Sequence, residues 1–117
     1  MDLTNAVGKH SEWKTKFRVA ISKQENMDAA TIGKDNYCEL GKWLHGEGKS
    51  KFGHLASHGD CILRHAAFHV EAGKVANAIN AKKFTEAEAM INSGTTYASA
   101  SSAVGVSIMK LQKEIGI

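Results

Sequence analysis

The stretch from His54 to Lys82, HLASHGDCILRHAAFHVEAGKVANAINAK, decides the fold of this 117-residue chain. Apolar residues and histidines recur in it at steps of three and four, which is the period of one face of an α-helix. The whole chain lacks proline, which permits a long helix without requiring one. We therefore expect one helix over about residues 54–82. Its stripe is formed by Leu55, His58, Ile62, His65, His69, Ala72, Ala76 and Ile79.

The segment before this stretch is expected to contain another long helix and a connector. A helical period runs from about Leu3 to Gln24 and places His10 and Trp13 on the apolar face. Residues 26–34 are predicted to be a connector with one helical turn near residues 28–32.

A short helix is expected to begin near Asn36, because Asn36 and Glu39 form a capping-box pattern. It would carry Cys38 in its first turn and end at Gly46 and Gly48. The polar, glycine-flanked residues 47–53 are predicted to form a loop or a loose turn.

The last helix is expected to be capped by Thr85, with Glu88 three residues later, and to continue to about Glu114. Small residues fill positions 93–103, which indicates either close packing against a neighbouring helix or a disordered low-complexity segment. The expected fold is all-α, an antiparallel four-helix-type bundle with one short helix carrying Cys38. We expect residues 1–117 to form a single domain.

Composition excludes several classes of function. The formal charge is +3, with 15 Lys and Arg against 12 Asp and Glu, and no basic block suggests a nucleic-acid partner. No apolar run is long enough to span a bilayer, and the N-terminus lacks the features of a signal peptide. We therefore expect a cytoplasmic domain without membrane contact. In that reducing setting the two cysteines favour metal binding or redox chemistry over a disulfide.

Six histidines in so short a chain point to a metal. His65 and His69 are four residues apart, so both rings lie on one helix face and can reach one ion. His10 lies on an apolar face where a polar ring needs a partner, although a backbone carbonyl could serve. Cys38 is predicted near a helix N-terminus, which favours the thiolate, the form that binds metal. Three imidazoles and one thiolate suit a tetrahedral Zn²⁺ ion.

Three motifs resemble those of the chemoreceptor zinc-binding domain family. They are His10-Ser11-Glu12-Trp13, then Cys38-Glu39-Leu40-Gly41-Lys42-Trp43, then His65-Ala66-Ala67-Phe68-His69. The family pattern is His-x-x-Trp, Cys-x-Leu-Gly-x-Trp and His-x-x-Phe-His in this order. The resemblance implies that His10, Cys38, His65 and His69 hold one zinc ion per chain, and that Trp13, Gly41, Trp43 and Phe68 pack around it.

The resemblance also implies a function. Such domains lie in cytoplasmic bacterial signalling proteins, chiefly at the C-termini of chemoreceptors and also on diguanylate cyclases, and they typically form homodimers. In chemoreceptors the zinc-bound cysteine is linked to sensing hypochlorous acid, so Cys38 is the expected redox-sensing residue. This chain is then expected to be cut from the C-terminus of a longer chemoreceptor whose signalling domain it modulates in chemotaxis.

Several alternatives remain open on the sequence alone. Four protein ligands leave no position for substrate, so an enzyme is not expected. A purely structural zinc module, the regulatory zinc domain of a diguanylate cyclase and an oxygen-carrying or haem bundle are other hypotheses. Cys61 and His58 could replace a ligand on spacing grounds, whereas His45 and His54 are expected to be solvated. The sequence does not reveal the parent protein's architecture, the physiological signal, the zinc affinity or the direction of the chemotactic response.

Overall fold

The long helices predicted from the sequence form the body of a helical bundle in the computed structural model, which describes residues 1–116. About 78% of the chain is helical, and the described part contains no strand. The elements are α1 (Leu3–Lys23), α2 (Ala29–Ile32), α3 (Glu39–His45), α4 (Glu47–Phe52), α5 (Ala56–Asn80), α6 (Phe84–Met90) and α7 (Thr96–Ile115). The all-α fold expected from the sequence is confirmed.

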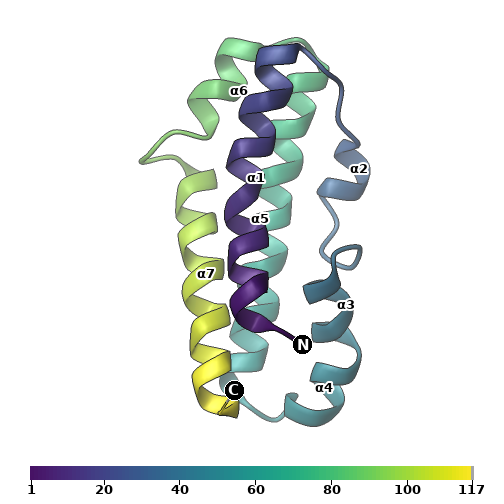
Figure 1. Cartoon of the computed structure of the whole chain (residues 1–117), viewed down its shortest axis with the longest axis vertical. Coiled ribbons are helices and arrows are strands. Elements are labelled where there is room, and N and C mark those ends of the chain that lie inside the picture. Colours follow the sequence, from purple (N-terminus) through teal and green to yellow (C-terminus); the bar gives the residue numbers. More distant parts are fainter. Residues whose placement is uncertain (117) are drawn as a thin grey trace.

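The chain runs up, down, up and down through an elongated body of 43 × 25 × 19 Å (Figure 1). Helices α1 and α5 ascend, α7 descends to their left in this view, and α2, α3 and α4 together descend on the opposite side. These three short helices occupy the fourth position of an antiparallel bundle. They therefore bring the segment around Cys38 against the middle of α1 and α5.

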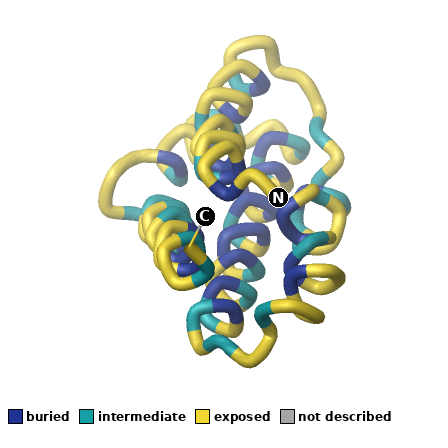
Figure 2. Tube along the Cα trace, turned by 60° about the horizontal axis from the view of Figure 1, so that its bottom comes forward, coloured by how far each residue is buried: buried dark blue, intermediate teal, exposed yellow. Residues whose placement is uncertain are grey.

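The core lies where the inner faces of the long helices meet (Figure 2). Helix α5 contributes the most buried positions, and the side chains of Phe68, Val75 and Ile79 are almost fully inaccessible. Phe17 of α1 and Leu111 of α7 pack into the same core. Burying such side chains provides about 1.5–3 kcal/mol each, which is the main force that holds the three helices together.

Two helix starts differ from the sequence-based expectation. The short helix begins after Cys38, whose Sγ accepts a hydrogen bond of 3.3 Å from the Gly41 amide, so the prediction of Asn36 as its cap is wrong. Glu39 faces Lys9 at 3.5 Å instead of closing a capping box. Thr85 does not cap the last segment either, because α6 already begins at Phe84.

The segment after Thr85 is two helices, not one. Helix α6 ends at Met90, Gly94 adopts a φ of 81°, and Thr95 then caps α7 by accepting a hydrogen bond from the Ala98 amide. A left-handed conformation suits glycine and interrupts a helix, which explains the break. Residues 96–103 are helical, so the disorder alternative is wrong.

The prediction of a loop or loose turn at residues 47–53 is also wrong, because helix α4 forms there. Lys51 and Glu47, four residues apart, make an ion pair of 2.7 Å on this helix. The ring of Phe52 lies 6.1 Å from that of Trp43. A local ion pair and one aromatic contact thus stabilise a turn of helix that composition alone assigns to a loop.

Candidate metal centre

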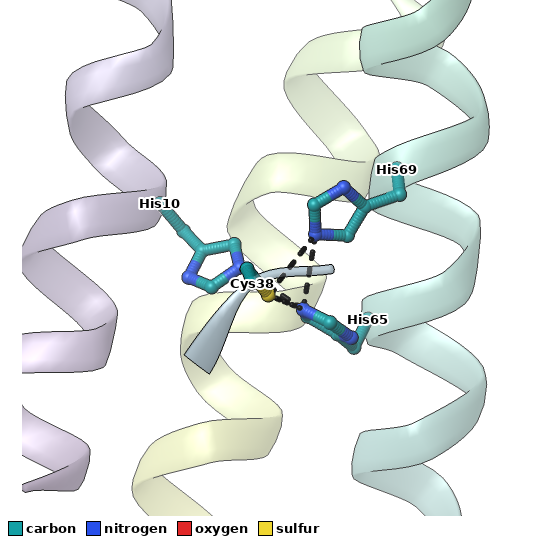
Figure 3. A group of neighbouring side chains, drawn as sticks. All are labelled: His10, Cys38, His65 and His69. Atoms are coloured by element: carbon teal, nitrogen blue, oxygen red, sulfur yellow. Dashed lines mark hydrogen bonds between the residues drawn. The ribbon is translucent and has the colours of Figure 1, made fainter. Parts of the chain in front are cut away.

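Four side chains from three parts of the chain converge between α1, α3 and α5 (Figure 3). They are His10 from α1, Cys38 at the start of α3, and His65 and His69 from α5. One possible ligand atom from each lies within 4.8 Å of all the others. The structure thus brings together all four residues that the sequence singled out.

Five of the six distances between these ligand atoms are close to those of a tetrahedral site. A zinc ion with bonds of about 2.05 Å to nitrogen and 2.3 Å to sulfur separates two nitrogens by roughly 3.3 Å and nitrogen from sulfur by roughly 3.6 Å. The Nε2 atom of His65 lies 3.1 Å from that of His10 and 3.0 Å from that of His69. The Sγ atom of Cys38 lies 3.2, 3.6 and 3.9 Å from the Nε2 atoms of His65, His69 and His10.

Backbone carbonyls orient two of the rings. Nδ1 of His10 donates to the Ala6 carbonyl at 2.8 Å, and Nδ1 of His69 donates to the Ile32 carbonyl at 2.8 Å. Because a carbonyl can only accept, the hydrogen of each neutral ring must sit on Nδ1. The lone pair of each Nε2 therefore points into the cluster, as a metal ligand requires.

Hydrogen bonds alone do not satisfy this cluster. With Nδ1 protonated in His10 and His69, only Cys38 and Nε2 of His65 could supply a hydrogen to the four converging atoms. At most two hydrogens are therefore available to four atoms that all approach one another, and Nδ1 of His65, which is buried, has no partner within the described residues whichever ring nitrogen carries the hydrogen. A cation at the centre would engage all four lone pairs. The residues present therefore fit one zinc ion per chain.

Burial keeps the histidines neutral. It is the largest cause that lowers the pKa of His10 and of His69, and together with neighbouring His69 and His10 it lowers the pKa of His65 to about 2. Neutral imidazole is the form that binds metal. The metal-free protein thus holds three imidazoles in the protonation state that zinc needs.

The sulfur behaves differently. Burial raises the pKa of the Cys38 thiol, and although the amides of Gly41 and Leu40 at the helix start lower it, their effect is smaller. The helix start thus favours the thiolate as expected from the sequence, but burial outweighs it in the metal-free protein. A bound cation would reverse this balance, because a coordinating thiol loses its proton.

The surrounding residues expected from the sequence have separate roles. Phe68 is fully buried, and its ring lies 5.4 Å from those of both His10 and His69, so it shields the site from water. Trp13 is half-buried and lines, with His10 and Cys38, a surface cavity. Trp43 packs on Phe52 instead.

A glycine is needed at position 41 because the backbone of Asp35 passes close to its Cα atom. A Cβ atom there would lie 1.6 Å from the Asp35 carbonyl oxygen and 3.2 Å from Cε1 of His65. Only glycine lets the preceding turn pass so close to α3. That turn leads directly into Cys38, so Gly41 helps to place the sulfur.

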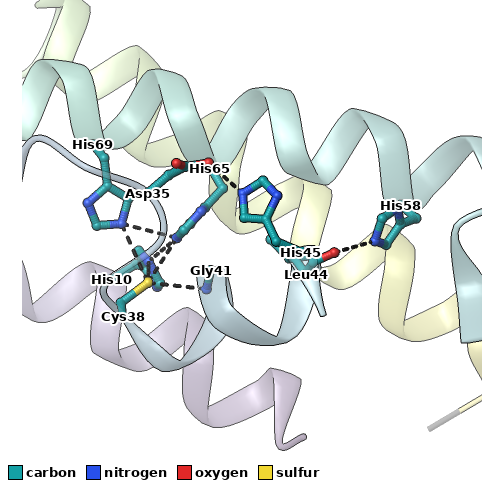
Figure 4. A network of polar contacts seen from close by, with 9 residues as sticks. All are labelled: His10, Asp35, Cys38, Gly41, Leu44, His45, His58, His65 and His69. Carbon is teal, nitrogen blue, oxygen red and sulfur yellow. Dashed lines mark hydrogen bonds and ion pairs between the residues drawn. The ribbon is translucent and has the colours of Figure 1, made fainter. Parts of the chain in front are cut away.

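The other histidines and the second cysteine lie outside the cluster, as Figure 4 shows for His58 and His45. His58 is buried and its Nε2 donates to the Leu44 carbonyl at 2.9 Å. Cys61 is fully buried in the core, and burial raises the pKa of its thiol to about 11. His45 is exposed, as expected, and its Nε2 lies 2.9 Å from Oδ2 of Asp35. His54 is exposed too.

Sequence reasoning missed the backbone partners of the site. The carbonyls of Ala6 and Ile32 orient two rings, and the glycines Gly33 and Gly73 meet beside one of them. Only the Ala6 carbonyl could have been predicted from the sequence, because His10 follows it by four residues on the same helix and can reach it. Ile32 lies 37 residues from His69, and no local pattern reports such a contact.

A comparison with protein families gives one match. The family model described as chemoreceptor zinc-binding domain matches residues 10–76, which is more than half of the chain and includes all four clustered residues. No curated protein and no solved structure matches the chain significantly. None of the described helices is both long and apolar enough to cross a membrane.

Proposed function

Because the chain belongs to the chemoreceptor zinc-binding domain family, we propose that it is a cytoplasmic regulatory domain of a bacterial chemoreceptor, in which a zinc ion held by His10, Cys38, His65 and His69 controls the position of α3. The observation that carries this proposal is the convergence of the four ligand atoms from three separate helices. Zinc, when bound, would hold the sulfur as a thiolate and cross-link these helices. The domain is regulatory and not catalytic, because four protein ligands fill a tetrahedral shell.

Helix α3 suits the role of the moving part. It has only seven residues, and its N-terminal end is attached to the cluster through Cys38. Its apolar anchor is small, with Leu40 and Leu44 buried and Trp43 half-buried. At the other end, the carbonyl of Leu44 accepts a hydrogen bond from His58. Release of the sulfur would therefore free the start of α3 while its end stays attached.

We propose oxidation of Cys38 as one signal and zinc itself as another. One molecule of hypochlorous acid converts one thiolate to a sulfenic acid and releases one chloride ion, so that sulfur loses the two electrons that chlorine gains. A sulfenic acid is a poorer ligand than a thiolate. Cys38 is the reactive site because Cys61 is fully buried and its thiol stays protonated, with a pKa raised to about 11.

The test treats zinc-loaded protein with limiting hypochlorous acid and locates the oxidised cysteine by mass spectrometry. We expect oxidation at Cys38 before Cys61, together with faster hydrogen exchange across residues 36–45. A Cys61→Ser variant should respond in the same way and serves as the matched control. Oxidation first at Cys61, or unchanged exchange after oxidation of Cys38, would leave only a structural role for the zinc.

A further inference from the structure

The segment around α2 crosses α5 beside the metal centre, and two adjacent backbone groups of this segment contact α5. We call residues 28–34 the α2 strap. At its first contact, Nδ1 of His69 donates to the Ile32 carbonyl at 2.8 Å. At its second contact, the next strap residue, Gly33, meets Gly73, which lies one helical turn after His69. Two consecutive strap residues therefore contact two α5 residues that are one helical turn apart.

The second contact has no room for a side chain on α5. A Cβ atom at Gly73 would lie 2.9 Å from Cα of Gly33, 3.5 Å from its amide nitrogen and 3.8 Å from the Ala29 carbonyl oxygen. All these atoms belong to the strap backbone, so no flexible side chain can move aside. Gly73 is buried in the interior of α5 and glycine weakens a helix there by about 1 kcal/mol relative to alanine. Helix formation therefore does not explain this residue.

We propose that Gly73 is a positioning residue of the metal centre, which lets the α2 strap lie close enough for the Ile32 carbonyl to orient His69. Raising the 2.9 Å separation to the roughly 3.5 Å of an ordinary carbon contact moves the strap outward by about 0.6 Å. A hydrogen bond of 2.8 Å would then lengthen to roughly 3.4 Å, where little of it remains. His69 would lose the partner that fixes its tautomer and aims its Nε2.

The expected effect follows from the role of such partners. Loss of a group that orients a metal-bound histidine typically weakens metal binding by about 10–100-fold. Gly73→Ala should therefore weaken zinc binding to this extent even though alanine is the better helix former. The inference rests on the proposed assignment of His69 as a ligand.

A matched control lies on the same helix. At Gly59 of α5 an added Cβ would meet nothing within 4 Å, so Gly59→Ala should leave zinc affinity unchanged and raise stability. Gly33→Ala is a milder test of the same contact, because its Cβ would lie 3.2 Å from the Ala29 oxygen and 3.8 Å from Cα of Gly73. Gly33 has a φ of −73°, which alanine adopts freely. We expect a loss of zinc affinity of only a few-fold there.

The experiment measures zinc affinity by chelator competition, unfolding of the metal-free protein by denaturant, and the ¹⁵N NMR signals of the His69 ring. In the metal-free Gly73→Ala protein the hydrogen-bonded Nδ1 signal should shift or lose its exchange protection. A purely structural role for Gly73 would lower stability and leave this signal in place. If Gly73→Ala does not fold, Gly33→Ala decides the question by the same readouts.

Two outcomes would overturn the inference: zinc affinity of a folded Gly73→Ala protein within twofold of the parent, or an equal loss in Gly59→Ala. Failure of the parent protein to bind zinc would instead contradict the proposed function. In that case the ring signal of the metal-free variants still tests the strap, so the two failures can be told apart.

Discussion

Zinc binding to the metal-free protein near pH 7 should release one proton, and that proton should come from Cys38. Burial lowers the pKa values of His10, His65 and His69 below the ordinary 6.5, so their rings are already neutral at this pH. Burial raises the pKa of the Cys38 thiol above its ordinary value of 9.0, so this group is still protonated. Coordination removes the thiol proton and none from the rings.

The magnitude follows from this proton count. One released proton makes zinc affinity rise about tenfold per pH unit, or about 1.4 kcal/mol, hence about 100-fold from pH 6 to pH 8. Histidines with the ordinary pKa of about 6.5 would add up to three protons, and the dependence would steepen markedly below that pH. The logarithm of zinc affinity should instead stay linear in pH below 6.5, because the rings are already neutral; that of His65 has a pKa of about 2.

Isothermal titration calorimetry in two buffers of different ionisation enthalpy counts the released protons directly. Cys38→Ser is the control, and any zinc that it still binds should be taken up with almost no proton release. Release of two or more protons at pH 7 by the parent would refute the reasoning, because the rings would then be protonated in the metal-free pocket. Release of none would show that Cys38 is not a ligand or is already a thiolate.

Three further results are expected. His65→Ala and His69→Ala should each weaken zinc binding by at least roughly tenfold and lower the melting temperature. His45→Ala should do neither, because its ring is exposed. Competition titrations that show a comparable loss of zinc affinity for all three variants would contradict the ligand set. Gly41→Ala should cost about 1–3 kcal/mol of unfolding free energy and weaken zinc binding, since its Cβ would collide with the Asp35 carbonyl; parent-like denaturation and zinc titration would reject this. Light scattering should give the mass of a homodimer, as the family resemblance implies, and a monomer mass at high concentration would disprove it.

The sequence predicted the long helices because their periodicity extends over many turns. Within the predicted stripe, His65, Ala72 and Ile79 are buried in the bundle. The boundaries of short elements were less accurate, because one hydrogen bond or ion pair decides them. The Cys38 sulfur replaced Asn36 as a cap, and an ion pair helped to form α4 where a loop was expected.

The four clustered residues could be identified because each lies in a motif with its own spacing. Periodicity placed His65 and His69 on one face, ligand chemistry added His10 and Cys38 as candidates, and the family resemblance supported the complete set. The residues that orient the site escaped prediction for a physical reason. The Ile32 carbonyl and the Gly33–Gly73 contact depend on how two distant backbone segments cross, and backbone atoms leave no local signature in the sequence.

The most direct test of the account is metal analysis of the purified protein combined with zinc X-ray absorption spectroscopy. We expect about one zinc ion per chain, with a ligand shell of one sulfur at about 2.3 Å and three imidazole nitrogens at about 2.0 Å. Cys38→Ser should remove the sulfur signal, and Cys61→Ser should leave it unchanged. A shell with two sulfurs, or a sulfur signal that persists in Cys38→Ser, would contradict the proposed site.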